Sequence, residues 1–134
     1  MKPSVLIVDD ESMTRDLLRL MLERAGFDIL EAEDGLKALL MVAEKAPDVL
    51  LLDVMMPNMD GLTVCEKLRA QAETAVLPII LLSARANPES IQEGMKAGAT
   101  RYLGKPVSRE ELVNTIREVL EGTPSTEPFS PPNN

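Results

Sequence analysis

The sequence predicts an α/β fold in which helices cover both faces of one parallel sheet. Short apolar segments of strand length alternate with amphipathic segments of helical length along the first 122 residues. The central apolar segment, 49–52, contains no polar residue, which is typical of a strand buried on both faces. Several apolar segments end in a charged or hydroxyl side chain, at the strand ends where open α/β sheets bind ligands.

Length and composition limit the class of protein. At 134 residues the chain is long enough for one domain with a buried core. A net charge of -8 disfavours direct binding to nucleic acid or to an anionic membrane, and no apolar run reaches the roughly 18 residues of a membrane span. A single cysteine and the lack of an N-terminal signal peptide favour the cytoplasm. The chain has no histidine, which excludes histidine-based catalysis and most zinc sites.

The first half of the chain predicts three strands, each followed by a helix. The first strand, 5–8, precedes a helix that we expect Ser12 to cap and Gly26 to close. The predicted apolar face of that helix comprises Leu17, Leu18, Met21, Leu22 and Ala25. A more polar strand over 27–32, expected at the sheet edge, and an Asp34-Gly35 turn lead to a helix over 36–45. The buried strand ends at Asp53, and a helix over about 62–70 follows.

The second half predicts two more strands and two more helices. A strand over 78–82 precedes a helix over 88–95 that contains few apolar residues, so we expect this helix to be the least stable one. After a strand over 100–104, Ser108 and Glu111 form a capping box for the last helix. The predicted buried stripe of that helix is Leu112, Ile116, Val119 and Leu120. We expect residues 1–122 to be the domain and 123–134, rich in Pro and Ser, to be a disordered tail or a truncated linker.

The predicted strand ends combine acids, a hydroxyl and an ammonium group. Asp9 and Asp10 follow the first strand, Asp53 ends the third, Ser83 follows the fourth and Lys105 the fifth. Taken singly, the acids are simple helix caps, the serine a loop hydroxyl and the lysine a surface charge. Together, three carboxylates need a cation, and without imidazole or a nearby thiolate the expected ion is Mg²⁺. This set favours phosphoryl transfer to a carboxylate.

These motifs resemble those of bacterial response-regulator receiver domains of the chemotaxis-regulator type, from Met1 to about Gly122. The matching residues are Asp9-Asp10, Asp53 in Leu-Leu-Asp-Val-Met-Met-Pro-Asn-Met-Asp-Gly, Ser83-Ala84, Tyr102 and Lys105-Pro106, and their spacing matches as well. The resemblance implies a flavodoxin-like (βα)5 fold with strand order 2-1-3-4-5. It also implies a two-component signalling switch rather than an enzyme.

The resemblance implies which residues accept phosphate and bind metal. Asp53 would accept a phosphoryl group from a histidine kinase or a histidine phosphotransfer domain. Asp10, Asp53 and the backbone carbonyl of Met55 would bind Mg²⁺ directly, and Asp9 would act mostly through water.

The resemblance also implies a switch. Lys105 and Ser83 would each bond a phosphoryl oxygen, Tyr102 would turn inward as Ser83 moves, and the Lys105-Pro106 peptide would be cis. Met55 and Arg85 lie two residues after Asp53 and Ser83, and we expect them to prolong the phosphorylated state, because neither can deprotonate water.

Other interpretations remain open. An aspartate-nucleophile phosphatase would place a second acid where Met55 stands, and a scaffold with a decayed site would lack part of the acid, hydroxyl and lysine set. The chain is either a stand-alone regulator or a receiver cut from a larger regulator or hybrid kinase, and its downstream effector is not specified. Thr100-Arg101 and Thr115 depart from the family branch that forms salt-bridged dimers. We expect the first helix, with Met13 and Leu20 partly exposed, and the loop after the fifth strand to dock the kinase.

Overall fold

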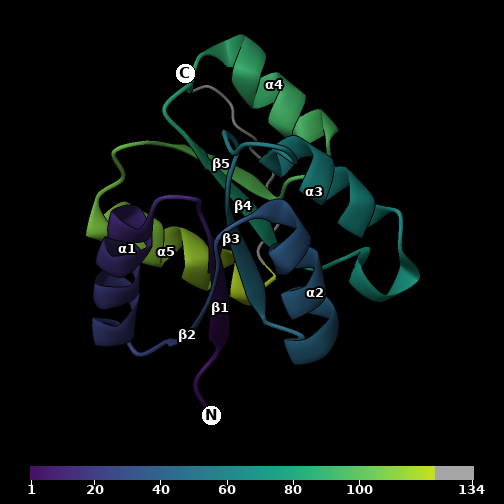
Figure 1. The fold of residues 1–134 in the computed structure, drawn as a ribbon. Coiled ribbons are helices and arrows are strands. Elements are labelled where there is room, and N and C mark those ends of the chain that lie inside the picture. Colours follow the sequence, from purple (N-terminus) through teal and green to yellow (C-terminus); the bar gives the residue numbers. More distant parts are fainter. Residues whose placement is uncertain (123–134) are drawn as a thin grey trace.

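The computed structural model describes residues 1–122 and confirms the predicted fold class (Figure 1). Five parallel strands form one sheet in the order β2-β1-β3-β4-β5. The strands are β1 (Ser4–Val8), β2 (Asp28–Ala32), β3 (Val49–Asp53), β4 (Ile79–Ser83) and β5 (Arg101–Gly104). The more polar strand β2 lies at the sheet edge, as predicted. The predicted tail over 123–134 lies outside the described residues.

Five helices cover the two faces of this sheet. They are α1 (Ser12–Arg24), α2 (Gly35–Lys45), α3 (Gly61–Arg69), α4 (Pro88–Lys96) and α5 (Arg109–Leu120), and a short 3-10 helix, η1 (Ala72–Thr74), was not predicted. Figure 1 shows α1 and α5 on one face of the sheet and α2 and α3 on the other. Within residues 1–122, no helix is both long enough and apolar enough to cross a lipid bilayer.

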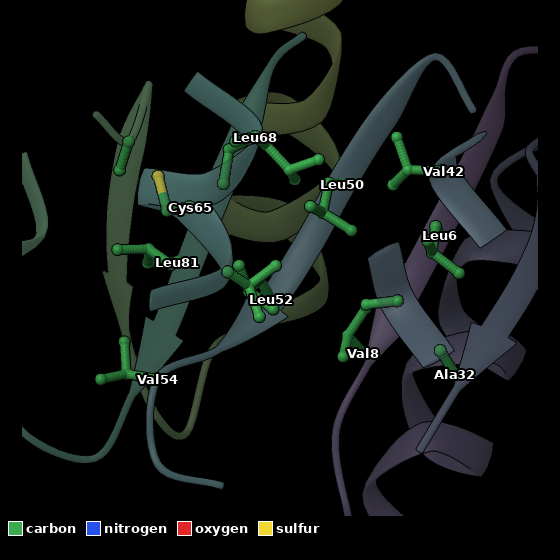
Figure 2. Close-up of a cluster of buried hydrophobic side chains, with 14 of the residues drawn as sticks. Leu6, Val8, Ala32, Val42, Leu50, Leu52, Val54, Cys65, Leu68 and Leu81 are labelled. Atoms are coloured by element: carbon green, nitrogen blue, oxygen red, sulfur yellow. The ribbon is translucent and has the colours of Figure 1, made fainter. Parts of the chain in front are cut away.

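The alternating side chains of the strands divide the core into two clusters. Leu6, Leu50, Leu52 and Leu81 pack toward α2 and α3, whereas the residues between them pack toward α1 and α5. Figure 2 shows part of the first cluster, including Cys65 and Leu68 of α3. Burial raises the pKa of the Cys65 thiol to about 11, so this cysteine is an unreactive core residue. Because both faces of β3 are covered, the strand is buried along its whole length, as its composition predicted.

The first helix corrects two predictions. Its N-cap is Glu11, which makes no side-chain capping bond, and Ser12 is already the first helical residue. Leu17 was predicted to be buried but is 56% exposed, since the helix turns only Leu18 and Leu22 fully toward the sheet. Leu17 therefore faces solvent although its neighbour Leu18 is buried. The periodicity of apolar residues alone could not distinguish the two.

The other helices begin at side-chain caps. Asp34, Asp60, Asn87 and Ser108 each accept a hydrogen bond from the backbone N–H three residues later. The prediction that Ser108 caps α5 is therefore confirmed, whereas Asp34 and Gly35 form a cap and a first helical residue rather than a separate turn. Most of the stripe predicted for α5 is buried, although Leu120 is only half-buried.

Candidate functional site

Three carboxylates converge at the carboxyl ends of β1 and β3. The register pairs Val8 with Leu52, so the residues that follow, Asp9 and Asp53, lie side by side. These two side chains are buried, and the next residue, Asp10, is exposed. One carboxylate oxygen from each of the three lies within 4.8 Å of the other two. The predicted acidic cluster is therefore assembled by parallel strand pairing.

Lys105 joins this cluster from the end of β5. Its ammonium lies 3.0 Å from Asp9 Oδ2 and 3.2 Å from Asp53 Oδ1, so it donates to both buried carboxylates. The following peptide, Lys105-Pro106, is cis, as the resemblance implied. The lysine side chain thus extends past β4, which separates β5 from β3 in the sheet. It is the only ammonium that the described residues bring to these acids.

Asp53 and Lys105 shift each other's pKa. Burial, and then the charge of Asp9, raise the pKa of Asp53 above 3.8, although Lys105 partly opposes this shift. Burial alone would lower the pKa of Lys105, but its hydrogen bond to Asp9 and the charges of Asp53 and Asp9 raise it. Lys105 therefore stays protonated and positively charged. The negative charge of Asp53 is only partly compensated by its surroundings.

Among the described residues, some carboxylate oxygens of the cluster accept no hydrogen bond and are free to bind a hard cation. Asp9 Oδ1 accepts from the backbone of Glu11 at 2.9 Å, and Asp53 Oδ1 accepts from the backbone of Met55 at 3.4 Å. Within residues 1–122, Asp53 Oδ2 and the Asp10 carboxylate accept no hydrogen bond. An exposed and a buried carboxylate that each have free oxygens and lie within reach of one another suit Mg²⁺, which prefers oxygen ligands and keeps several waters.

The predicted switch residues meet at the loop after β4, a strand whose Leu82 pairs with Asp53 of β3. Ser83 is buried, and its hydroxyl accepts from the backbone N–H of Arg85 at 3.0 Å. The Tyr102 hydroxyl donates to the backbone carbonyl of Arg85 at 2.5 Å. Ser83 and Tyr102 therefore hold one peptide segment from two sides. Met55 is half-exposed and the Arg85 side chain is exposed, so both lie at the surface of the site.

Two contributors to the site were missed in the sequence. A Cβ at Gly61 would overlap the backbone carbonyl oxygen of Asp53, so the loop between β3 and α3 can close only over a glycine. The Asp60-Gly61 dipeptide is the sequence signal that could have indicated this glycine. Arg15 of α1 donates to the backbone carbonyl of Asp9 at 2.7 Å, a contact between a helical side chain and a loop carbonyl for which the sequence carries no motif.

Comparison with known proteins gives a consistent result. Residues 5–117 match the family model described as the response regulator receiver domain. The chain is 45% identical over 119 residues to the response regulator MprA of Mycobacterium leprae, covering 89% of this chain and 51% of that protein. It is 38% identical over 121 residues to the DNA-binding dual master transcriptional regulator RpaA of Synechocystis, covering 90% of this chain and 50% of that protein. The chain thus spans about half the length of these two relatives.

Some solved structures with the same fold match along nearly their whole chains. The chemotaxis protein CheY4 of Vibrio cholerae is 35% identical with a TM-score of 0.84, and the match covers 89% of this chain and 99% of that one. The receiver domain of the Francisella response regulator 1452 is 34% identical with a TM-score of 0.85, covering 91% and 99% respectively.

Proposed function

The chain belongs to the response regulator receiver domain family, and from this premise we propose that it is a switch of a two-component system, phosphorylated on Asp53 with Mg²⁺. One observation carries the proposal: Asp53 is buried at the end of β3 beside Lys105 and Asp9, yet has one oxygen free of hydrogen bonds within the described residues. The phosphoryl donor is a histidine kinase or a histidine phosphotransfer domain.

The transfer is a substitution at phosphorus. The free oxygen of ionised Asp53 attacks the phosphorus of a phosphohistidine, and a P–O bond forms while the P–N bond breaks. The bonding electron pair returns to the imidazole nitrogen, so that a histidine protonated on its other nitrogen leaves. Lys105 already donates to Asp53 and can follow the new phosphoryl oxygens with the same ammonium.

The acidic cluster supplies the metal ligands in this proposal. Asp10, Asp53 and the backbone carbonyl of Met55 bind Mg²⁺, and Asp9 acts mostly through water because Lys105 and the Glu11 amide already occupy its oxygens. When bound, Mg²⁺ offsets charge on the phosphoryl oxygens and the repulsion among the carboxylates. The raised pKa of Asp53 supports this, since it marks a carboxylate whose charge lacks full compensation.

The output of the switch passes through the loop after β4. A phosphoryl group on Asp53 offers new acceptor oxygens, and the Ser83 hydroxyl can donate to one of them if the loop closes. This loop is bonded through Arg85 to the Tyr102 hydroxyl, so its movement releases the ring to turn inward. Helix α4, which begins at Pro88 just after the loop, is the element that shifts.

The partners follow from this role. RpaA is named as DNA-binding, but with a net charge of -8 we infer that this chain contacts proteins rather than nucleic acid, in the cytoplasm. Arg101 pairs with Glu118 of the same chain at 3.9 Å, and the Thr115 hydroxyl donates to Glu111 within α5, so we do not propose a salt-bridged dimer.

The test is labelling by acetyl phosphate with Mg²⁺, followed by intact mass. The wild-type chain should gain one base-labile phosphoryl group, and Asp53→Ala should gain none. Asp60→Ala, which removes only the exposed cap of α3, is the matched control and should label normally. Label that persists on Asp53→Ala would place the acceptor elsewhere, and continuous turnover of the donor without accumulated label would favour a phosphatase.

A further inference from the structure

Arg15 connects helix α1 to the loop that carries the acidic pair. One terminal nitrogen of its guanidinium donates to the backbone carbonyl of Asp9 at 2.7 Å. Its Nε lies 3.1 Å from Glu31 Oε1, on the edge strand β2. The side chain is only 18% exposed. A planar guanidinium can hold both partners at fixed angles, which a flexible ammonium does less well.

Glu31 is itself fixed from a second side. Its other oxygen accepts from Arg19, one helical turn further along α1, at 2.6 Å. Arg19 is 42% exposed, and within residues 1–122 it pairs with Glu31 and Asp16, not with the acidic loop. The two arginines therefore carry the same charge and share the same glutamate, but only Arg15 reaches the backbone next to the site.

We propose that Arg15 is a positioning residue for the metal-binding carboxylates. The inference rests on the proposed function, because it concerns the same Mg²⁺ site. The carbonyl of Asp9 and the amide of Asp10 belong to one planar peptide, so a bond that fixes this carbonyl also fixes the direction in which the Asp10 side chain leaves the backbone. Asp10 makes no hydrogen bond of its own within residues 1–122, so its direction depends on this peptide.

The sign of the effect separates positioning from electrostatics. Arg15 is a cation near three carboxylates, so on charge alone its removal should strengthen binding of Mg²⁺. If Arg15 positions Asp10, its removal should instead weaken binding, since the outer contacts that orient metal ligands are worth roughly tenfold or more in affinity. Arg19→Gln makes the same change in charge without touching the Asp9 carbonyl and serves as the matched control.

The experiment is a titration of the full chain with MgCl₂ at constant ionic strength, followed by amide shifts in NMR spectra, with the free energy of unfolding measured in parallel. We expect Arg15→Gln to bind Mg²⁺ roughly tenfold more weakly than wild type, and Arg19→Gln to bind as wild type does. Arg15→Lys keeps the charge and should also bind more weakly. It carries the test if Arg15→Gln does not fold.

The possible outcomes distinguish this inference from the proposed function. Wild-type and Arg15 variants that bind Mg²⁺ equally, or variants that bind more tightly, would overturn the positioning role and leave the proposed function intact. Equal weakening in Arg15→Gln and Arg19→Gln would also overturn it, because the effect would then belong to Glu31. A wild-type chain that binds no Mg²⁺ would overturn the proposed function and the inference with it.

Discussion

At the scale of single residues, two opposing influences act on the ionisation of Asp53. Burial and the neighbouring Asp9 disfavour its negative charge, whereas the Lys105 ammonium favours it, and the net effect raises its pKa above 3.8. In the pH range between the unfolded and folded pKa values, the folded state binds more protons than the unfolded state. The free energy of unfolding therefore falls as pH rises through that range, and the loss is complete above the folded-state pKa.

Asp53→Asn should therefore make the protein more stable at pH 7 without metal. The advantage over wild type should shrink as pH falls toward 3.8, where the wild-type carboxyl becomes neutral as well. Mg²⁺ should reverse the order, stabilising wild type by about 1.4 kcal/mol at about ten times Kd and the variant far less. Urea unfolding at several pH values, with Mg²⁺ and with EDTA, measures both effects. A wild type that is more stable than the variant at pH 7 in EDTA would contradict the first.

Met55 should control how long the phosphoryl group stays. Its thioether is half-exposed beside Asp53 and has no group to orient or deprotonate an attacking water. We expect a half-life of minutes or more for the phosphorylated protein in Mg²⁺, and roughly tenfold faster decay in Met55→Asn, whose amide can hold a water in line. Met55→Leu preserves the apolar cover and is the control. Decay of the wild type within seconds, or equal decay in all three, would exclude this role.

At the scale of secondary structure, α4 and β5 meet at a glycine. A Cβ at Gly94 would lie 2.6 Å from Cδ2 of the Tyr102 ring and 2.9 Å from Cδ1 of Leu81. Gly94 lies inside α4, the helix that the sequence predicted to be the least stable. This contact explains why a glycine stands at position 94: the absence of a side chain leaves room for the Tyr102 ring, which we propose as part of the switch.

Gly94→Ala should therefore destabilise the protein, although alanine is the better helix former by up to about 1 kcal/mol. The displaced ring should cost about 1–3 kcal/mol, as overpacking of a core does. In a Tyr102→Ala background most of that loss should disappear, so a double-mutant cycle of unfolding free energies should give a coupling of at least about 0.5 kcal/mol. Additive effects of the two substitutions would show that the ring does not depend on Gly94.

The element scale also shows where the sequence was sufficient. Strand β3 and the helix caps depend on residues that lie within a few positions of one another in the sequence. The sequence therefore predicted strand β3 and the Ser108 cap. The predicted burial of Leu17 was wrong. The packing of α1 on the sheet, and not the spacing of its apolar residues, decides whether Leu17 or Leu18 is buried. The short helix η1 is a single turn with no buried residue, and so leaves no pattern to detect.

At the scale of the whole molecule, the strand order makes the site. The sequence predicted that acids, a hydroxyl and a lysine follow different strands, and a parallel sheet places such ends at one edge. The pairing of β1 with β3, rather than with β2 alone, brings Asp9 beside Asp53. That pairing and the reach of Lys105 across β4 are long-range properties, and the Arg15 contact depends on the direction of its side chain. Residue types and spacing could therefore suggest a site but not its bonds.

The same architecture leaves an apolar stripe exposed next to the site. Met13, Leu17 and Leu20 recur at helical spacing on α1, which begins two residues after Asp10, and all three are exposed. The predicted exposure of Met13 and Leu20 is thus confirmed, and Leu17 joins them. An apolar stripe beside the proposed phosphoacceptor would suit a helical partner that brings a phosphohistidine to Asp53.

Leu17→Glu should slow phosphoryl transfer from a partner kinase roughly tenfold, the usual order for losing one central interface anchor. Labelling by acetyl phosphate should be unchanged, because that donor needs only the site. Leu36→Glu and Leu40→Glu are matched controls, since these leucines are similarly exposed on α2, across the sheet, and should leave both reactions intact. Initial rates with both donors at equal Mg²⁺ give the comparison. Equal loss with both donors would mean that Leu17→Glu damages the fold, and equal slowing of kinase transfer by the α2 variants would move docking away from α1.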